Sequence, residues 1–196
     1  MDAHTYNFYR SEIWKRRNIY EELVFGEFFE QIENVYLAIK KSFDSGGKLL
    51  IFGNGGSATE ADHLAGELVC KFEKTRKALP AIAITTSPAI LTAQSNDNDF
   101  DSIFVRQIEA LGKPGDIAMG ITTSDAQKKH STNILRGFLM ARVRKMTTIG
   151  LVSQKTQWLL KVIDHPIVIP HESTDIIQEA HRTMIHILCK RIESEL

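Results

Sequence analysis

Short apolar runs alternate with longer amphipathic segments from residue 48 onward. The runs occupy residues 48–52, 81–85, 116–121, 146–152 and 166–170. Each run has the length of a buried strand, and the intervening segments are long enough to form crossover helices. The pattern therefore predicts a three-layer α/β fold, in which a doubly wound parallel sheet is covered by helices on both faces.

The first 44 residues have a helical pattern instead. Apolar side chains recur there at steps of three and four, as in Phe28, Ile32, Val35, Tyr36, Ile39 and Phe43. We expect two N-terminal helices, and we divide the chain into a helical arm of residues 1–44 and a domain of residues 45–196. The arm is rich in aromatic residues, which leaves two interpretations open: ordinary packing onto the domain, or an oligomerisation surface.

Composition narrows the range of functions. The chain has 196 residues, of which 43% are apolar, and this is enough for one domain with a full core. Lysine and arginine total 24, as do aspartate and glutamate, so no overall charge attracts nucleic acid or an anionic membrane. No apolar stretch approaches the length of a membrane span, and no targeting segment is visible. We expect a cytoplasmic protein without a nucleic-acid or membrane partner.

The two cysteines indicate that the protein works in a reducing compartment. Cys70 and Cys189 lie more than a hundred residues apart and form no metal-binding or disulfide spacing. We expect both to be buried thiols.

A glycine-rich segment directly follows the first predicted strand. It reads Gly53-Asn54-Gly55-Gly56-Ser57, and a helical segment begins near Thr59. Glycines permit close approach of the backbone to a ligand, while the free amides of a helix start attract an anion. The spacing matches neither the dinucleotide-binding motif nor the P-loop, which disfavours nucleotide binding. Taken alone, the segment is equally typical of an ordinary turn.

A second polar loop follows the third predicted strand. It carries Thr122, Thr123 and Ser124, and a helix is expected from Thr132. Ligands of parallel sheets bind beyond the carboxyl ends of the strands, so these hydroxyl groups and the glycine loop together suit a phosphate ester. A capped helix start is the alternative interpretation.

Two helical segments carry possible metal ligands. His63 and Glu67 are four residues apart, so they emerge on one helix face and could chelate a cation. By itself this spacing more often gives a surface hydrogen-bonded pair. Near the C-terminus, Gln178, Arg182 and His186 also share one helix face and could converge on one point.

Together, these motifs resemble the SIS family of phosphosugar-binding domains, and its phosphoheptose isomerase branch fits best. The resemblance extends from about residue 20 to residue 195. It includes residues 53–57, 61–68, 79–84 and 177–181, with Asn96, Asp97 and His186. It implies a flavodoxin-like fold, a homotetramer and an aldose-ketose isomerase. The implied reaction converts sedoheptulose 7-phosphate to D-glycero-D-manno-heptose 7-phosphate through an enediol, the first step of nucleotide-activated heptose synthesis.

The resemblance also implies roles for individual residues. A catalytic Zn²⁺, one per subunit, would be held by His63, Glu67, Gln178 and His186. Glu67 would be the base that carries the carbon-bound proton, and His186 the acid/base for oxygen-bound protons. Substrate would contact Asn54, Gly55, Gly56, Ser57, Lys71, Asn96, Asp97, Thr122, Thr123, Ser124, Asp175 and Gln178. Lys71, expected one turn beyond Glu67 on the same helix, stands where many relatives have arginine.

Two other histidines are not expected to bind the metal, and the loop after the third predicted strand differs from that of the family. His181 is expected to support the metal ligands, whereas His165 is expected to be structural. The residues 125–128 look inserted, and the charge of Asp125 would need compensation from Lys128, Lys129 or His130.

Two rival functions stay open. A non-catalytic SIS relative, such as the replication-initiator-associated homologue, would bind a partner protein and would lack the histidine at position 186. A metal-independent isomerase or sensor of hexose phosphates would have no reason to keep all four ligands.

Overall fold

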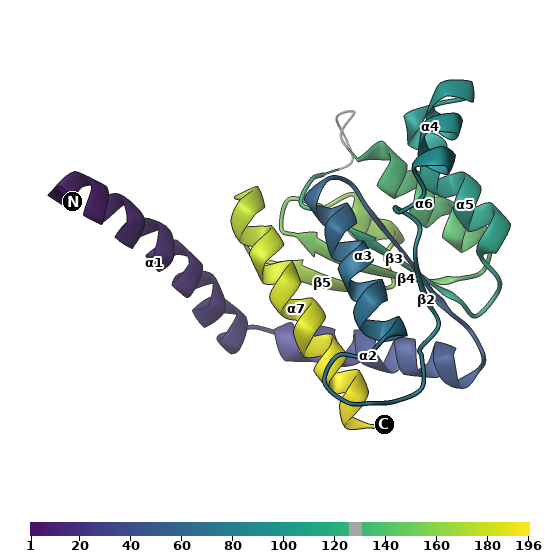
Figure 1. Ribbon diagram of the computed structural model, residues 1–196, viewed down its shortest axis with the longest axis horizontal. Helices are drawn as coiled ribbons and strands as arrows, with labels where there is room; N and C mark the ends of the chain where they lie inside the picture. The colour runs from purple at the N-terminus through teal and green to yellow at the C-terminus, as the bar shows by residue number, and fades with distance from the viewer. Residues whose placement is uncertain (126–130) are drawn as a thin grey trace.

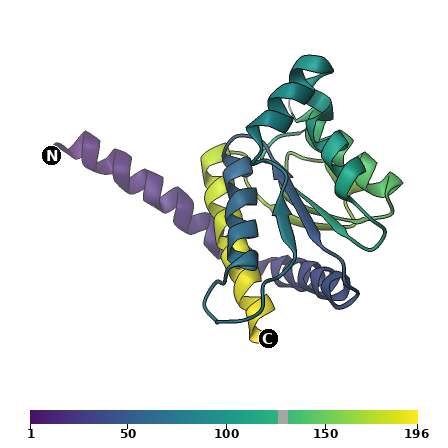
Figure 2. The ribbon, with the colours of Figure 1, turned by 45° about the vertical axis from the view of Figure 1, so that its right-hand side comes forward.

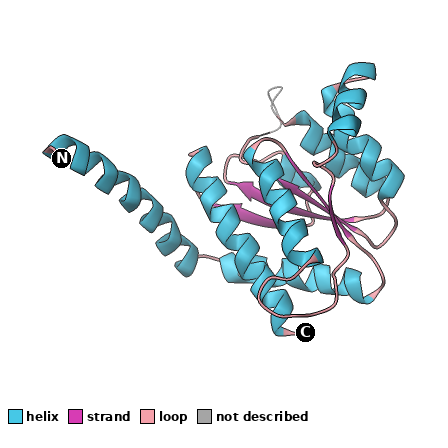
Figure 3. Ribbon diagram, in the orientation of Figure 1, coloured by secondary structure: helices cyan, strands magenta, loops and turns pink. Residues whose placement is uncertain are grey.

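The computed structural model of the chain describes residues 1–125 and 131–196 (Figure 1). Within them, five parallel strands form one sheet in the order β2-β1-β3-β4-β5. Figure 3 shows the strands in magenta among the helices. The strands are β1 (Leu49–Gly53), β2 (Ala81–Ala83), β3 (Ile117–Ile121), β4 (Thr147–Ser153) and β5 (His165–Ile169). Each predicted run overlaps one of these strands, and the bounds of run and strand differ by no more than two residues.

Helices cover both faces of the sheet, which confirms the three-layer fold (Figure 2). One face is covered by α2 (Phe28–Asp44), α3 (Gly56–Val69) and α7 (Thr174–Ser194). The opposite face is covered by α5 (Ile103–Leu111) and α6 (Thr132–Val143), with α4 (Pro88–Asp97) packed against α5. Short 3₁₀ turns are η1 (Phe100–Ser102) and η2 (Leu159–Val162).

The alternation of side chains along each strand explains why both faces of the sheet are apolar and covered by helices. In β1, Leu49 and Ile51 belong to the core under α2, α3 and α7, whereas Leu50 and Phe52 belong to the core under α5 and α6. Successive side chains of a strand point to opposite faces, so a strand buried on both sides must be apolar throughout. The uninterrupted apolar runs of the sequence are the result.

The N-terminal segment forms two helices, as predicted, but they differ in environment. α1 (Ala3–Phe25) begins at Asp2, whose carboxylate accepts a hydrogen bond from the Thr5 backbone, and it projects from the molecule (Figure 1). Phe25 is exposed, whereas Phe28 and Tyr36 of α2 are buried in the core of the sheet. Phe28 and Tyr36 therefore serve ordinary packing, whereas Phe29 of the same helix is exposed. The division of the chain at residue 44 into an assembly arm and a catalytic domain stays a prediction.

Exposed apolar side chains remain along α1. They are Tyr6, Phe8, Tyr9, Ile13, Trp14, Tyr20, Val24 and Phe25. The helix is nevertheless fixed to α7, because Arg16 pairs with Asp175 at 2.8 Å and with Glu179 at 2.8 Å. Within the described residues, no helix combines the length and the apolar character needed to cross a bilayer.

Two local expectations were wrong. α3 begins at Gly56 rather than near Thr59, because Gly55 adopts a positive φ of 54° and the Ser57 backbone bonds to the Asn54 carbonyl at 2.9 Å. Cys70, expected to be buried, is exposed just beyond the end of α3. Cys189 is buried as expected, and burial raises the pKa of its thiol to about 12.

Candidate active site

The two polar loops meet at the carboxyl edge of the sheet. Gly53 at the end of β1 pairs with Ile121 at the end of β3, so the segments that follow are neighbours. Ser57 lies buried in the first turn of α3, and Thr122 and Thr123 are buried after β3. The Thr123 hydroxyl lies 3.5 Å from that of Thr174, at the start of α7. Hydroxyl groups and a helix N-terminus thus gather where a phosphate ester was predicted.

Asn54 has a partner that the sequence did not suggest. Its side chain exchanges two hydrogen bonds with Asn133, at 2.9 and 2.8 Å, and Asn133 is buried in the first turn of α6. The pair fastens the glycine loop to the helix on the other face of the sheet. The only available signal was a polar residue directly after a predicted helix start, which usually indicates capping.

α3 and α7 lie side by side and bring the predicted metal ligands together (Figures 1 and 2). His63 Nε2 lies 3.6 Å from Glu67 Oε1 on α3, and 2.9 Å from His186 Nε2 on α7. An imidazole-carboxylate pair and a second imidazole from a helix more than a hundred residues away therefore meet within one chain. The two helices that carry these side chains belong to one chain.

We tested whether this arrangement suits a zinc ion. Two imidazoles and a carboxylate form a donor set typical of zinc. Among the described residues, no group of three or more His, Cys, Asp or Glu is already arranged as a metal centre. The two ring nitrogens, at 2.9 Å, are closer than the roughly 3.4 Å that tetrahedral bonds of about 2.1 Å require. The donors fit zinc chemically, and the rings must separate by about half an ångström to hold it.

Gln178 lies at the other end of the α3–α7 contact. Its side-chain amide rests on Gly56, where an added Cβ would overlap it. Gln178 and His186 are eight residues apart, which is about 12 Å along a helix. The structure thus joins His63, Glu67 and His186, while the role of Gln178 as a fourth ligand stays a prediction.

An ion pair lies between these two groups. Arg182 donates two hydrogen bonds to the carboxylate of Glu60, at 2.6 and 2.9 Å, and so joins α7 to α3. Glu60 is buried, and sequence reasoning missed it although it lies one helical turn before His63. Burial lowers the pKa of His63, and the Arg182 cation lowers it further. Both effects favour the neutral imidazole.

An open groove of about 370 Å³ runs beside this ion pair. It is lined by Glu60, Asp175, Gln178, Glu179 and Arg182. Asp175 lies in the first turn of α7, where its carboxylate accepts hydrogen bonds from Ser173 and from Arg16 of α1. The predicted substrate residues Asp175 and Gln178 therefore share one groove.

Other predicted residues lie apart from this cluster. Asn96 donates to Asp97 at 3.1 Å, at the end of α4, and no hydrogen bond in the described part of the chain joins them to α3 or α7. Lys71 is exposed in the loop after α3, which ends at Val69, so its expected place on the same helix was wrong. Lys128, Lys129 and His130 lie outside the described residues.

His181 and His165, two further histidines considered from the sequence, lie away from the site. His181 is buried against β4, and its Nε2 lies 3.2 Å from the Val152 carbonyl, so the expectation that it supports the metal ligands was wrong. Burial lowers the pKa of His181 to about 4. His165 lies at the start of β5, at the opposite edge of the sheet from the polar loops.

Comparisons with known proteins identify the family of the chain. Residues 16–153 match the SIS domain family. The phosphoheptose isomerase of Thermodesulfovibrio yellowstonii is 44% identical, over 93% of this chain and 92% of that protein. That of Geotalea daltonii is 41% identical, over 95% of both.

Solved structures show the same likeness. The phosphoheptose isomerase from Francisella tularensis superposes with a TM-score of 0.90 at 31% identity, covering 97% of this chain and 98% of that one. The phosphoheptose isomerase from Neisseria gonorrhoeae gives a TM-score of 0.88 at 30% identity, covering 97% and 99%.

Proposed function

Since the chain belongs to the SIS domain family and, within it, to the phosphoheptose isomerases, we propose that it converts sedoheptulose 7-phosphate to D-glycero-D-manno-heptose 7-phosphate. It is an isomerase of sugar phosphates. The observation that supports the specific reaction is the meeting of His63, Glu67 and His186 across the α3–α7 contact.

The reaction exchanges a ketone at C2 for an aldehyde at C1. A base must remove a proton from C1, and O2 must be protonated to give the enediol. Return of the proton to C2 and loss of the O1 proton then complete the aldose. Glu67 is suited to move the carbon-bound proton, and His186 to move protons between the two oxygens, because both reach the same face of the α3–α7 pair.

The proposed cofactor is one zinc ion per subunit. His63, Glu67 and His186 would hold it, with Gln178 as a weaker fourth donor through its amide oxygen. When bound, zinc would polarise the sugar carbonyl. A carboxylate held tightly by a metal is a poor base, so Glu67 is expected to bind loosely.

The phosphate group is proposed to bind at the carboxyl edge of the sheet. The first turn of α3 begins there with Gly56 and the buried Ser57, and the Thr122, Thr123 and Ser124 segment lies beside it. Amides and hydroxyls can hold a phosphate ester without a large positive charge. We also propose that the enzyme works in the cytoplasm as a homotetramer assembled through α1.

A direct test follows aldose formation from sedoheptulose 7-phosphate and from fructose 6-phosphate, with zinc-loaded and with chelated protein. We expect turnover of the heptulose only, and its loss after chelation. Full activity in chelator would contradict the zinc proposal, and preference for fructose 6-phosphate would contradict the substrate.

A variant test addresses Glu67. Exchange of solvent hydrogen into the substrate at C1 and C2 should stop in Glu67→Gln. The matched control is Asp62→Asn, which changes an exposed carboxylate on the same helix and should leave exchange unchanged. Unimpaired exchange in Glu67→Gln would exclude Glu67 as the base.

A further inference from the structure

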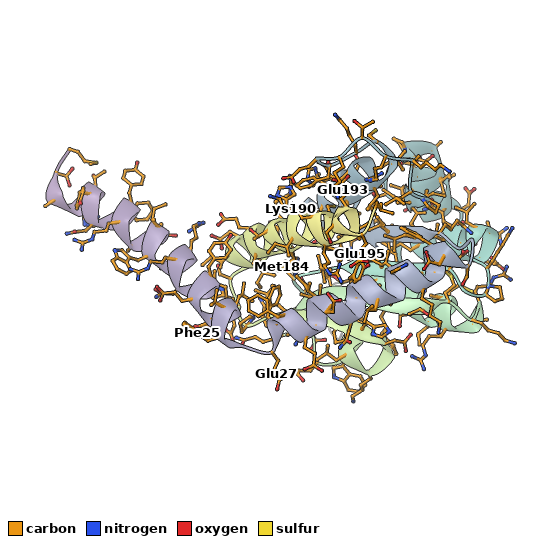
Figure 4. The ribbon with its side chains drawn as sticks, turned by 90° about the horizontal axis from the view of Figure 1, so that it is seen from below. Phe25, Glu27, Met184, Lys190, Glu193 and Glu195 are labelled. Atoms are coloured by element: carbon orange, nitrogen blue, oxygen red, sulfur yellow. The ribbon has the colours of Figure 1, made fainter. Side chains whose placement is uncertain are left out.

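A buried carboxylate on α7 binds the loop that follows α3. Glu193, 3% exposed, accepts hydrogen bonds from three successive backbone amides, those of Phe72, Glu73 and Lys74, at 3.0, 2.8 and 2.8 Å. It also accepts one from Arg76 Nε at 2.9 Å. Figure 4 shows Glu193 on the C-terminal half of α7. Each oxygen of this buried carboxylate therefore accepts two hydrogen bonds, and three of the four donors are backbone amides of one short loop.

Arg76 extends the same network to the end of α3. Its Nη1 donates to the Leu68 carbonyl at 2.8 Å, and its Nη2 donates to the Glu67 carbonyl at 2.8 Å. The last carbonyls of a helix lack partners within the helix, so Arg76 completes the C-terminus of α3. The backbone of the proposed base is therefore one of the groups that the network holds.

The loop also reaches the proposed acid/base. The ring of Phe72 packs on the imidazole of His186, with centroids 5.3 Å apart and planes inclined by 32°. His186 and Glu193 are seven residues apart, so they lie on the same side of α7, two turns from one another. Glu193 thus fixes the backbone of the residue whose ring restricts His186.

We propose that Glu193 and Arg76 are positioning residues, which hold the loop of residues 72–76 so that Phe72 and the end of α3 fix His186 and Glu67. The inference rests on the proposed function for the roles of His186 and Glu67. Neither Glu193 nor Arg76 lines the groove that holds Asp175 and Gln178, two of the predicted substrate residues. Their effect on catalysis is exerted through the orientation of two other side chains.

The main test compares Glu193→Gln with Lys190→Gln. Lys190 pairs with Glu73 at 2.9 Å, so it joins the same helix to the same loop, but both side chains are exposed. At a temperature where circular dichroism shows both variants folded, we expect kcat of Glu193→Gln to fall by about tenfold or more with KM little changed, since misplacement of a catalytic group lowers turnover. Lys190→Gln should retain both constants.

A second readout is independent of activity. Carbethoxylation of His186 by diethyl pyrocarbonate, in chelated full-length protein, reports how freely its ring is reached; the exposed His4 serves as the internal reference. Modification should be faster in Glu193→Gln and in Phe72→Ala than in wild type or Lys190→Gln. Phe72→Ala leaves the Glu193 carboxylate intact and replaces Glu193→Gln if that variant does not fold.

The two readouts distinguish failure of the positioning role from failure of the proposed function. If folded Glu193→Gln or Phe72→Ala keeps wild-type modification of His186, the positioning role is overturned, even where kcat falls. If wild type fails to isomerise the heptulose while modification rises in both variants, the proposed function is wrong but the loop does hold His186.

Discussion

Gly56 and Gly66 of α3 differ in what an added methyl group would meet. At Gly56 the methyl would overlap the side-chain amide of Gln178, whereas at Gly66 it would meet nothing within 4 Å. Alanine favours a helix over glycine by about 1 kcal/mol, so neither substitution should destabilise the fold much. Comparison of the two variants therefore distinguishes the effect of displacing Gln178 from the effect of adding a methyl group to α3.

We expect Gly56→Ala to lower zinc affinity by about tenfold, as is typical when a ligand or its support is displaced. Gly66→Ala should leave zinc affinity unchanged and raise the free energy of unfolding by up to about 1 kcal/mol. Competition with a chromophoric chelator measures the first quantity, and urea denaturation the second. Equal affinities in the two variants would show that Gln178 does not take part in metal binding.

Glu193 gives a second prediction for a single residue. Burial opposes its charge, but the backbone amides of Lys74, Phe72 and Glu73 and the Arg76 cation outweigh burial and lower the pKa of Glu193 to about 2. The pKa is lower in the folded than in the unfolded chain, so the stabilisation is complete above about pH 4.5 and is lost as pH falls toward 2.

Acid denaturation followed by circular dichroism tests this. Over the interval from pH 5 to 2, wild type should lose on the order of 3 kcal/mol more than Glu193→Gln, since one pKa unit corresponds to about 1.4 kcal/mol. Parallel curves for the two proteins would contradict the assignment of the low pKa to Glu193.

At the scale of elements, the contact between α3 and α7 decides whether a site exists. His63 and Glu67 belong to one helix and His186 to the other, so the distance between the helices sets the distance between the imidazoles. The Glu60–Arg182 ion pair is the polar contact that joins these helices beside the groove.

We expect Arg182→Gln to lower turnover by about tenfold, because a small displacement of catalytic groups is costly. A double-mutant cycle with Glu60→Gln should give a coupling energy of about 1 kcal/mol, since Arg182 is 40% exposed and water screens its charge.

The matched control is Arg191→Gln. Arg191 makes an equivalent two-bond contact from α7 to Glu33 of α2, on the side of α7 away from the groove. This variant should lose similar stability and keep its turnover. A comparable loss of turnover in both arginine variants would mean that Arg182 has only a structural effect.

At the scale of the whole molecule, α1 stands out because it projects from the three-layered domain (Figure 1). Ile19 and Leu23 of α1 are buried, and Arg16 fixes the helix to α7, but its other large apolar side chains are exposed. An exposed row of large apolar groups is costly in water and typical of a subunit interface. The same Arg16 contacts place α1 next to the groove, so the proposed assembly helix and the proposed substrate residue Asp175 are in direct contact.

We therefore expect Ile13→Glu, combined with Trp14→Glu, to reduce the proposed tetramer to smaller species without loss of helix content. Light scattering after gel filtration gives the mass, and circular dichroism the helicity. Val143→Glu introduces a charge at an equally exposed apolar position on α6 and should leave the mass unchanged. A wild-type monomer would contradict the proposed assembly.

The sequence alone determined the layers and the local spacing of the site. The uninterrupted apolar runs specify strands buried on both faces, because neighbouring side chains of a strand face opposite layers. The four-residue step from His63 to Glu67 specifies one helix face for the same kind of reason. Both are periodicities of the backbone itself, so no knowledge of distant contacts is needed.

Only the tertiary structure decided which of these groups meet. The His63–His186 contact joins residues 123 positions apart, and the Glu60–Arg182 pair joins residues 122 apart. The end of α3, misjudged at Lys71, is set by Arg76 and Glu193, with no glycine or proline stop signal at that point. Periodicity fixes the face of a helix, but the packing of one helix on another fixes its partners.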